Sequence, residues 1–135
     1  MKDPPIDNLV ITLAQGRDDH TVCVSIAGDV DIAGEAQLAR AARQLAATCC
    51  TRVYIDLKAV TFAGSTLINF LFRLSTHLPG NASMTLCRPD AMTVGLIELT
   101  GLSEFATVRA DLPAEWTMAQ VRDGGPVAAL TCSLA

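Results

Sequence analysis

The sequence predicts a single α/β domain, in which a mixed central β-sheet of about five strands is covered by about four helices. Short apolar runs typical of strands alternate with stretches at helical spacing, in the order β-β-α-β-α-β-α-β-α. Half of the 135 residues are hydrophobic but only 4% are aromatic, so the core must be mainly aliphatic. We expect the domain to span residues 9–121, after an N-terminal lead-in (1–8) and before a C-terminal tail (122–135).

The first part of the chain predicts a β-hairpin followed by a helix. Residues 9–13 and 21–26 alternate or run apolar on either side of the polar stretch 15–19, which is the pattern of two antiparallel strands. Gly28-Asp29-Val30-Asp31 is expected to form a turn that ends the second strand. From residue 33 to 48 the sequence is alanine-rich with apolar residues at helical spacing, which predicts a helix covering the sheet.

A strand and a helix form the centre of the predicted fold. Val53–Leu57 has the pattern of a buried strand, and residues 60–64 are expected to form a loop. The helix begins at Ser65, whose hydroxyl is expected to cap the first turn, and it ends before Pro79-Gly80. At 100° per residue one helical stripe should pack on the sheet, formed by Leu67, Phe70, Leu71, Leu74 and Leu78.

The opposite side of this helix predicts a docking surface. Ile68 and Phe72 are expected to point outward together with Ser65, and Asn69 lies beside them. Apolar side chains where a solvated helix would carry charges favour contact with a partner. The same pair could instead pack under the C-terminal segment or close a homodimer.

The last part of the chain predicts two more strands and two more helices. Residues 83–87 are expected to form a strand, and Asp90 caps a helix with Met92, Leu96 and Leu99 on one face. Gly101 suits the left-handed position after this helix. A short strand (105–108) and a helix (112–121) should complete the domain.

Composition and motifs argue against several classes of function. A net charge of −4 with scattered Lys and Arg does not favour nucleic acid, and the absence of a long apolar run or signal-like N-terminus predicts a cytoplasmic protein without membrane insertion. Neither a nucleophile elbow nor a phosphate-binding loop occurs, so we expect no enzyme and no cofactor. His20 and His77 lack ligand spacing, so no metal site is expected, and reduced thiols are expected at Cys23, Cys49, Cys50, Cys87 and Cys132.

Four short motifs in the same order and spacing give the chain a family resemblance. They are the Gly28–Asp31 turn, the strand at 53–57, the loop and helix start at 60–66, and Thr100-Gly101-Leu102 before the last strand. In these features the chain resembles a STAS domain, and most closely the bacterial anti-sigma factor antagonists. The resemblance covers roughly residues 8 to 110.

The resemblance implies partner switching. Such an antagonist binds an anti-sigma factor that is also an ATP-binding serine kinase, releases a sigma factor for transcription, and is switched off by phosphorylation. Ser65 matches the family's phosphoacceptor and Thr66 the second hydroxyl residue in a pattern like D-S-S/T-G-L. Asp31 matches a position that contacts the anti-sigma factor in relatives, and the partner-binding candidates are Asp29, Asp31, Gly64, Ile68, Asn69 and Phe72.

Two positions depart from the family pattern. Gly64 stands in the place of the aspartate and Leu67 in the place of the glycine. These departures keep a second interpretation open, in which the chain is a STAS scaffold or regulatory module without a phospho-switch, such as a soluble subunit of a transporter or a stress-signalling complex. A third interpretation is a sensor that holds a small molecule in an apolar groove.

Overall fold

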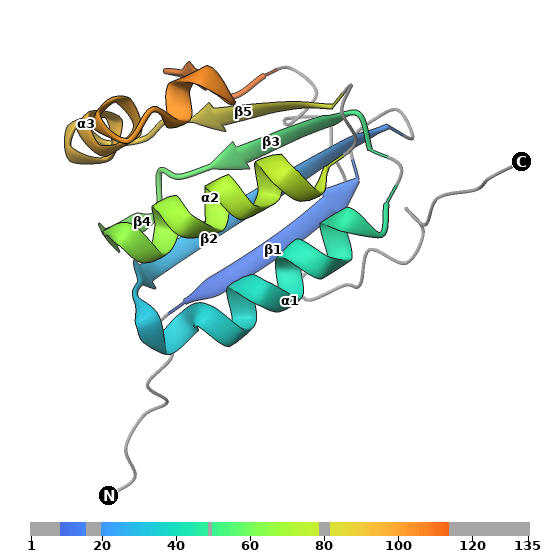
Figure 1. Cartoon of the computed structure of the whole chain (residues 1–135), viewed down its shortest axis with the longest axis horizontal. Helices are drawn as coiled ribbons and strands as arrows, with labels where there is room; N and C mark the ends of the chain where they lie inside the picture. The colour runs from blue at the N-terminus through green and yellow to red at the C-terminus, as the bar shows by residue number, and fades with distance from the viewer. Residues whose placement is uncertain (1–8, 16–19, 49, 79–81, 114–135) are drawn as a thin grey trace, which may run out of the picture.

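The computed structural model describes residues 9–15, 20–48, 50–78 and 82–113. Within them the chain forms a mixed sheet with helices between its parallel strands (Figure 1). In chain order the elements are β1 (Val10–Gln15), β2 (Thr21–Val30), the 3-10 turn η1 (Ile32–Gly34), α1 (Glu35–Ala46), β3 (Arg52–Asp56), β4 (Val60–Ala63), α2 (Ser65–His77), β5 (Ser83–Cys87), α3 (Ala91–Leu99), the 3-10 turn η2 (Leu102–Glu104) and β6 (Thr107–Arg109).

The sheet confirms the α/β prediction and adds one strand to it. Its main order is β1-β2-β3-β5-β6, and β4 pairs separately with the end of β2. β1 and β2 are antiparallel, as the hairpin pattern predicted, whereas β2, β3, β5 and β6 are parallel neighbours. Parallel neighbours require crossover connections, and α1, α2 and α3 supply them.

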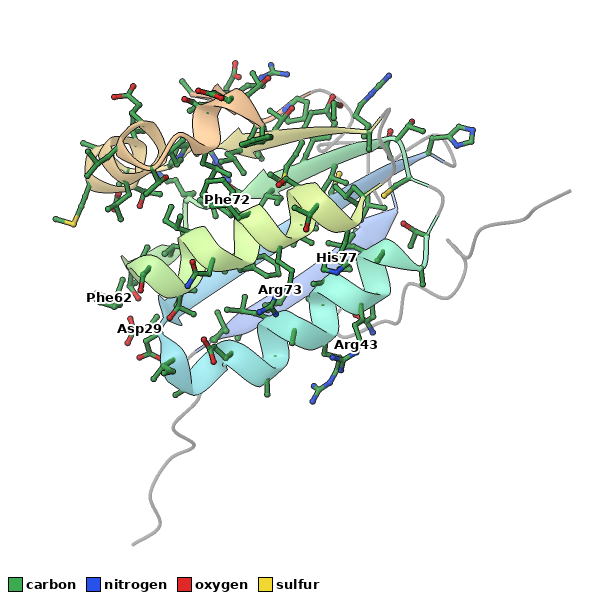
Figure 2. The ribbon with its side chains drawn as sticks, in the orientation of Figure 1. Asp29, Arg43, Phe62, Phe72, Arg73 and His77 are labelled. Carbon is green, nitrogen blue, oxygen red and sulfur yellow. The ribbon has the colours of Figure 1, made fainter. Side chains whose placement is uncertain are left out.

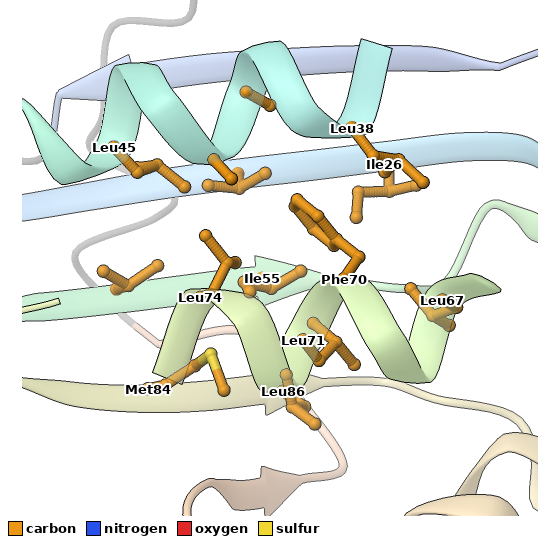
Figure 3. Packing of buried hydrophobic residues seen from close by; sticks show 14 of the residues in the cluster. Ile26, Leu38, Leu45, Ile55, Leu67, Phe70, Leu71, Leu74, Met84 and Leu86 are labelled. Atoms are coloured by element: carbon orange, nitrogen blue, oxygen red, sulfur yellow. The ribbon is translucent and has the colours of Figure 1, made fainter. Parts of the chain in front are cut away.

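The core lies between the sheet and the helices α1 and α2, which lie side by side across one of its faces (Figure 1). The predicted stripe of α2 is buried as expected, with Leu67, Leu71 and Leu74 fully covered. Figure 3 shows Leu71 and Leu74 over the sheet residues Ile55 and Leu86, and Phe70 on the side of α2 that faces α1. Each such burial contributes roughly 1.5–3 kcal/mol relative to an exposed side chain, so this stripe fixes α2 on the sheet.

Two segments between the elements differ from the sequence prediction. Residues 60–63, expected to be a loop, form the strand β4. The Gly28–Asp31 segment is not a simple turn, because β2 continues through it to Val30 and pairs with β4. Gly28 adopts a φ of 100°, and the register shifts between Gly28 and Asp29. A left-handed residue of this kind is compatible with a bulge that lets the strand continue in a new direction.

The ends of α3 are predicted correctly, whereas its predicted apolar face packs against the core only through Leu96. Asp90 accepts a hydrogen bond from the Thr93 amide at 2.8 Å, and Gly101 adopts a φ of 82°. However, Met92 and Leu99 are 74% and 83% exposed, while the helix buries Thr93 and Ile97. Almost every residue of α3 is uncharged, so the apolar pattern alone could not select the face that meets the sheet.

Several expectations concern residues outside the described part of the chain. They are the loop at 16–19, Cys49, most of the helix at 112–121, the tail at 122–135 with Cys132, and the lead-in at 1–8. Within the described residues Cys23, Cys50 and Cys87 are buried, and no helix is both long and apolar enough to cross a membrane. The last strand lies at 107–109, two residues after its predicted start.

Candidate functional site

The start of α2 presents Ser65 to solvent. β4 ends at Ala63, and Gly64 is the residue that caps the helix, with a φ of −149° and no side chain to accept a hydrogen bond. The expectation that Ser65 itself is the cap is therefore wrong, because Ser65 is the first residue of the helix. Its side chain is exposed. The hydroxyl is accessible, and Gly64, the N-cap residue, offers no side chain to the amides of the first turn.

Two strand ends bring the acidic candidates to the same edge as Ser65. β2 and β4 run parallel, with Val30 opposite Ala63. The residues that follow them, Asp31 and Gly64, therefore leave the sheet side by side. Asp31 caps η1 by accepting a hydrogen bond from the Ala33 amide at 3.1 Å.

Asp29 is tied directly to the strand that leads into α2. The Thr61 hydroxyl donates a hydrogen bond to Asp29 Oδ1 at 2.5 Å, across the pairing of β2 with β4. This bond fixes the carboxylate while leaving its second oxygen available to a partner. The structure thus brings Asp29, Asp31 and Ser65 to one end of the molecule.

Phe62 is a candidate that the sequence analysis missed. Its ring is 56% exposed although the residue stands opposite Asp29 in a strand pair. A Cβ atom placed on Gly64 would lie 3.9 Å from the Phe62 Cζ atom, so the ring borders the start of α2. Figure 2 shows Phe62 and Asp29 at the same end of the molecule. The available signal was an aromatic residue three positions before the candidate serine, in a segment that we took for a loop.

We call the resulting patch the Ser65 surface: Asp29, Asp31, Phe62, Ser65 and the exposed Asn69. It combines one exposed aromatic ring with two carboxylates and carries no basic side chain. Aromatic rings anchor protein interfaces by filling pockets, while surrounding charges select the partner. The arrangement suits protein recognition.

Two of the predicted partner-binding residues do not belong to this surface. Ile68 is only 5% exposed and is part of the main core, so the expectation that it points outward is wrong. Phe72 is half-buried, and its ring meets that of Phe105 edge-to-face with centroids 5.9 Å apart. α2 is covered on a second side by η2 and its neighbouring residues, and this widens the buried arc beyond the stripe that faces the sheet.

The two departures from the family pattern lie in different environments. Leu67 is fully buried in the core. Gly64 is half-buried at the edge of the Ser65 surface, beside the half-buried Thr66. Only Gly64 therefore alters what a partner can touch.

The ionisable groups with shifted pKa values lie at the end of β5 and at the start of α3. Arg88 donates hydrogen bonds to both carboxylate oxygens of Asp56, at 3.0 and 2.5 Å, and this bond raises the pKa of the guanidinium. The pair joins the ends of β3 and β5. The Thr93 amide lowers the pKa of Asp90, and burial raises the pKa of Cys87 to about 11. Within the described residues no group of three potential ligands could hold a metal ion.

Comparisons with known proteins agree with this architecture. The model of the STAS domain family matches residues 12–114. No curated protein sequence matches the chain. An anti-sigma factor antagonist from Mycobacterium paratuberculosis is 21% identical, with a TM-score of 0.66 over 84% of this chain and 96% of the other.

Two further solved structures are forms of the antagonist SpoIIAA. The unphosphorylated form is 15% identical, with a TM-score of 0.64 over 81% of this chain and 93% of its own. The phosphorylated form, from Bacillus, is 16% identical, with a TM-score of 0.55 over 81% of this chain and 96% of its own. At these identities the solved structures establish the shared fold. Because the family model extends over well more than half of the sequence, this chain belongs to the STAS domain family.

Proposed function

We propose that the protein is an anti-sigma factor antagonist that binds an anti-sigma factor of the serine-kinase type through the Ser65 surface and so releases a sigma factor. The observation that carries the proposal is the exposed Ser65 beside the exposed ring of Phe62 at the start of α2. Solved neighbours of the same fold are described as anti-sigma factor antagonists. The role is that of a binding protein in the cytoplasm, without catalysis of its own.

Phosphorylation of Ser65 would act as the switch by changing the interface and leaving the fold intact. A phosphate adds a charge of about −1.5 to −2 and is stabilised by the amides and dipole of a helix N-terminus. In the complex the same dianion would be desolvated beside Phe62 and close to the carboxylate of Asp31. Burying an uncompensated charge costs several kcal/mol, and each 1.4 kcal/mol weakens binding about tenfold.

The second candidate is a STAS scaffold that has lost the switch. The observation that favours it is Gly64, which stands where the family pattern has an aspartate. Of the two departures from that pattern, it is the one that a partner could touch. Such a module would bind its complex through the same face without being regulated at Ser65. A homodimer through Ile68 and Phe72 is not part of either proposal, since the first is buried and the second packs on Phe105.

Intact-mass analysis of protein from its own cells, prepared with phosphatase inhibitors, tests the switch. We expect one phosphate on the wild type and on Thr66→Ala, and none on Ser65→Ala. A phosphate that persists in Ser65→Ala and disappears in Thr66→Ala would move the acceptor to Thr66. Absence of phosphate under both growth and stress would contradict the switch and favour the scaffold.

Capture from native cytosol tests the partner. An antagonist should recover a small ATP-binding protein of the kinase type, whereas a transporter subunit should recover a membrane ATPase. With the partner purified, Ser65→Asp should weaken binding at least tenfold, and the uncharged Ser65→Asn should change it less than about threefold. Equal affinities for the two variants would show that charge at Ser65 has no regulatory effect.

A further inference from the structure

A groove separates α1 and α2 on the side of the helices that faces away from the sheet. Its volume is about 180 Å³. It lies beyond the Ser65 surface, toward the C-terminal ends of the two helices (Figure 2). Six residues line it: Ala39, Ala42, Arg43 and Ala46 from α1, and Arg73 and His77 from α2.

The charge of this groove is opposite to that of the protein. The chain carries a net charge of −4, but α2 contains no acidic residue and α1 contains only Glu35 at its first position. Within the described residues, Arg43 and Arg73 take part in no ion pair. Other arginines do form ion pairs there, among them Arg88 with Asp56 and Arg109 with Asp111. Two arginines without an acidic partner among the described residues therefore contribute to the lining of the groove.

The third polar residue is held in place by the helix backbone. His77 Nδ1 lies 2.8 Å from the carbonyl oxygen of Arg73. Because a carbonyl can only accept, Nδ1 must be the donor, and Nε2 is left to interact with another group. Figure 2 shows Arg73 and His77 on the side of α2 that faces α1, and Arg43 at the outer edge of α1.

The remaining lining is formed by three methyl groups. Ala39, Ala42 and Ala46 come from successive turns of α1 and leave a shallow apolar floor. Larger side chains there would fill the space between the helices. The volume is below the roughly 300–1,000 Å³ of sites that hold drug-sized ligands, so a ligand must be small.

We propose that this groove binds a small organic anion, with the anionic group on Arg43 and Arg73 and a short aliphatic body on the alanine floor. Guanidinium groups present fixed, always charged donors that match a carboxylate or a phosphate. The site is separate from the Ser65 surface and does not depend on partner switching.

An NMR titration of the full-length ¹⁵N-labelled protein with hexanoate tests the proposal. We expect saturable shifts of amides in α1 and α2 around the groove, and much smaller, non-saturating shifts with 1-hexanol and with hexylamine. Arg43→Gln and Arg73→Gln should each weaken hexanoate binding at least tenfold. Both side chains are exposed, so these variants should keep the wild-type midpoint of urea unfolding.

Arg40→Gln is the matched control, because Arg40 is an exposed arginine of α1 that does not line the groove. It should change hexanoate affinity less than twofold. Three results would each overturn the proposal: no saturation with hexanoate, equal binding of 1-hexanol, or equal losses in Arg40→Gln and Arg73→Gln.

Discussion

Replacing Ile68 with alanine tests whether this side chain is buried in the core. Its burial decides whether this face of α2 can bind a partner. The side chain is 5% exposed and belongs to the main hydrophobic core. The substitution removes roughly three carbons, which at about 0.8 kcal/mol for each buried methylene amounts to about 2.4 kcal/mol. The cavity left behind adds to this loss, and Ile to Ala changes in cores cost about 2–5 kcal/mol. We expect the free energy of unfolding to fall by about 3 kcal/mol.

Urea denaturation followed by circular dichroism measures the effect. With an m value of about 1.5–2 kcal/mol/M, a loss of about 3 kcal/mol lowers the midpoint by about 1.5–2 M. Ile68→Val should cost only about 0.5–1.5 kcal/mol. Asn69→Ala is the matched control, since the next residue along the helix is exposed and should change stability by less than about 0.5 kcal/mol.

The result that would refute the reasoning is an Ile68→Ala variant as stable as Asn69→Ala. Such a result would indicate that Ile68 is exposed, and the predicted docking surface of Ile68 and Phe72 would again be a candidate for partner binding. Partner affinity gives an independent check. If Ile68 acts only through the core, Ile68→Val should bind the partner within about twofold of wild type, whereas Phe62→Ala should lose at least tenfold.

Three smaller predictions follow from local geometry. Gly64→Asp should stabilise the protein by about 0.5 kcal/mol in thermal unfolding, because a carboxylate at this position can cap the helix and a Cβ atom on Gly64 would make only ordinary contact with Phe62; destabilisation would show that the backbone at Gly64 does not accept a side chain. Asp90→Ala should cost about 1 kcal/mol by removing the cap on Thr93, with Asp90→Asn much milder. Burial raises the pKa of Cys87 from 9.0 to about 11, so the folded state retains the thiol proton longer than the unfolded state. Its stabilising contribution is complete below pH 9 and is lost toward pH 11, so wild type should lose more stability over that window than Cys87→Ala; equal losses would exclude Cys87 as the cause.

The elements that sequence predicted well are those in which one strong local signal determines the outcome. The stripe from Leu67 to Leu78 has a single apolar phase, and it is the stripe that packs on the sheet. Asp90 and Gly101 bound α3 through side-chain and backbone chemistry that operates within a few residues. Such signals do not depend on what the rest of the chain does.

The prediction was wrong where the burial or secondary structure of a segment depends on a neighbouring element that is distant in sequence. Ile68 is buried because α2 is covered on a second side, and the chain near Phe105 that covers it lies more than 30 residues away in sequence. β4 forms because β2 extends past Gly28 and offers it a partner. For Ile68 a signal was available: it stands at the leucine position of the family pattern, where an apolar residue fits a buried role.

The two departures from the family pattern have unequal consequences for a phospho-switch. Leu67 replaces the glycine of the pattern, but its side chain is fully buried, so no partner or kinase meets it. Gly64 replaces the aspartate and leaves the first-turn amides of α2 without a side-chain acceptor. A phosphate on Ser65 would not compete with a neighbouring carboxylate for these amides, and less like-charge repulsion would oppose it. Under the proposed switch, the altered loop would therefore favour the phosphorylated state of Ser65 once it has formed.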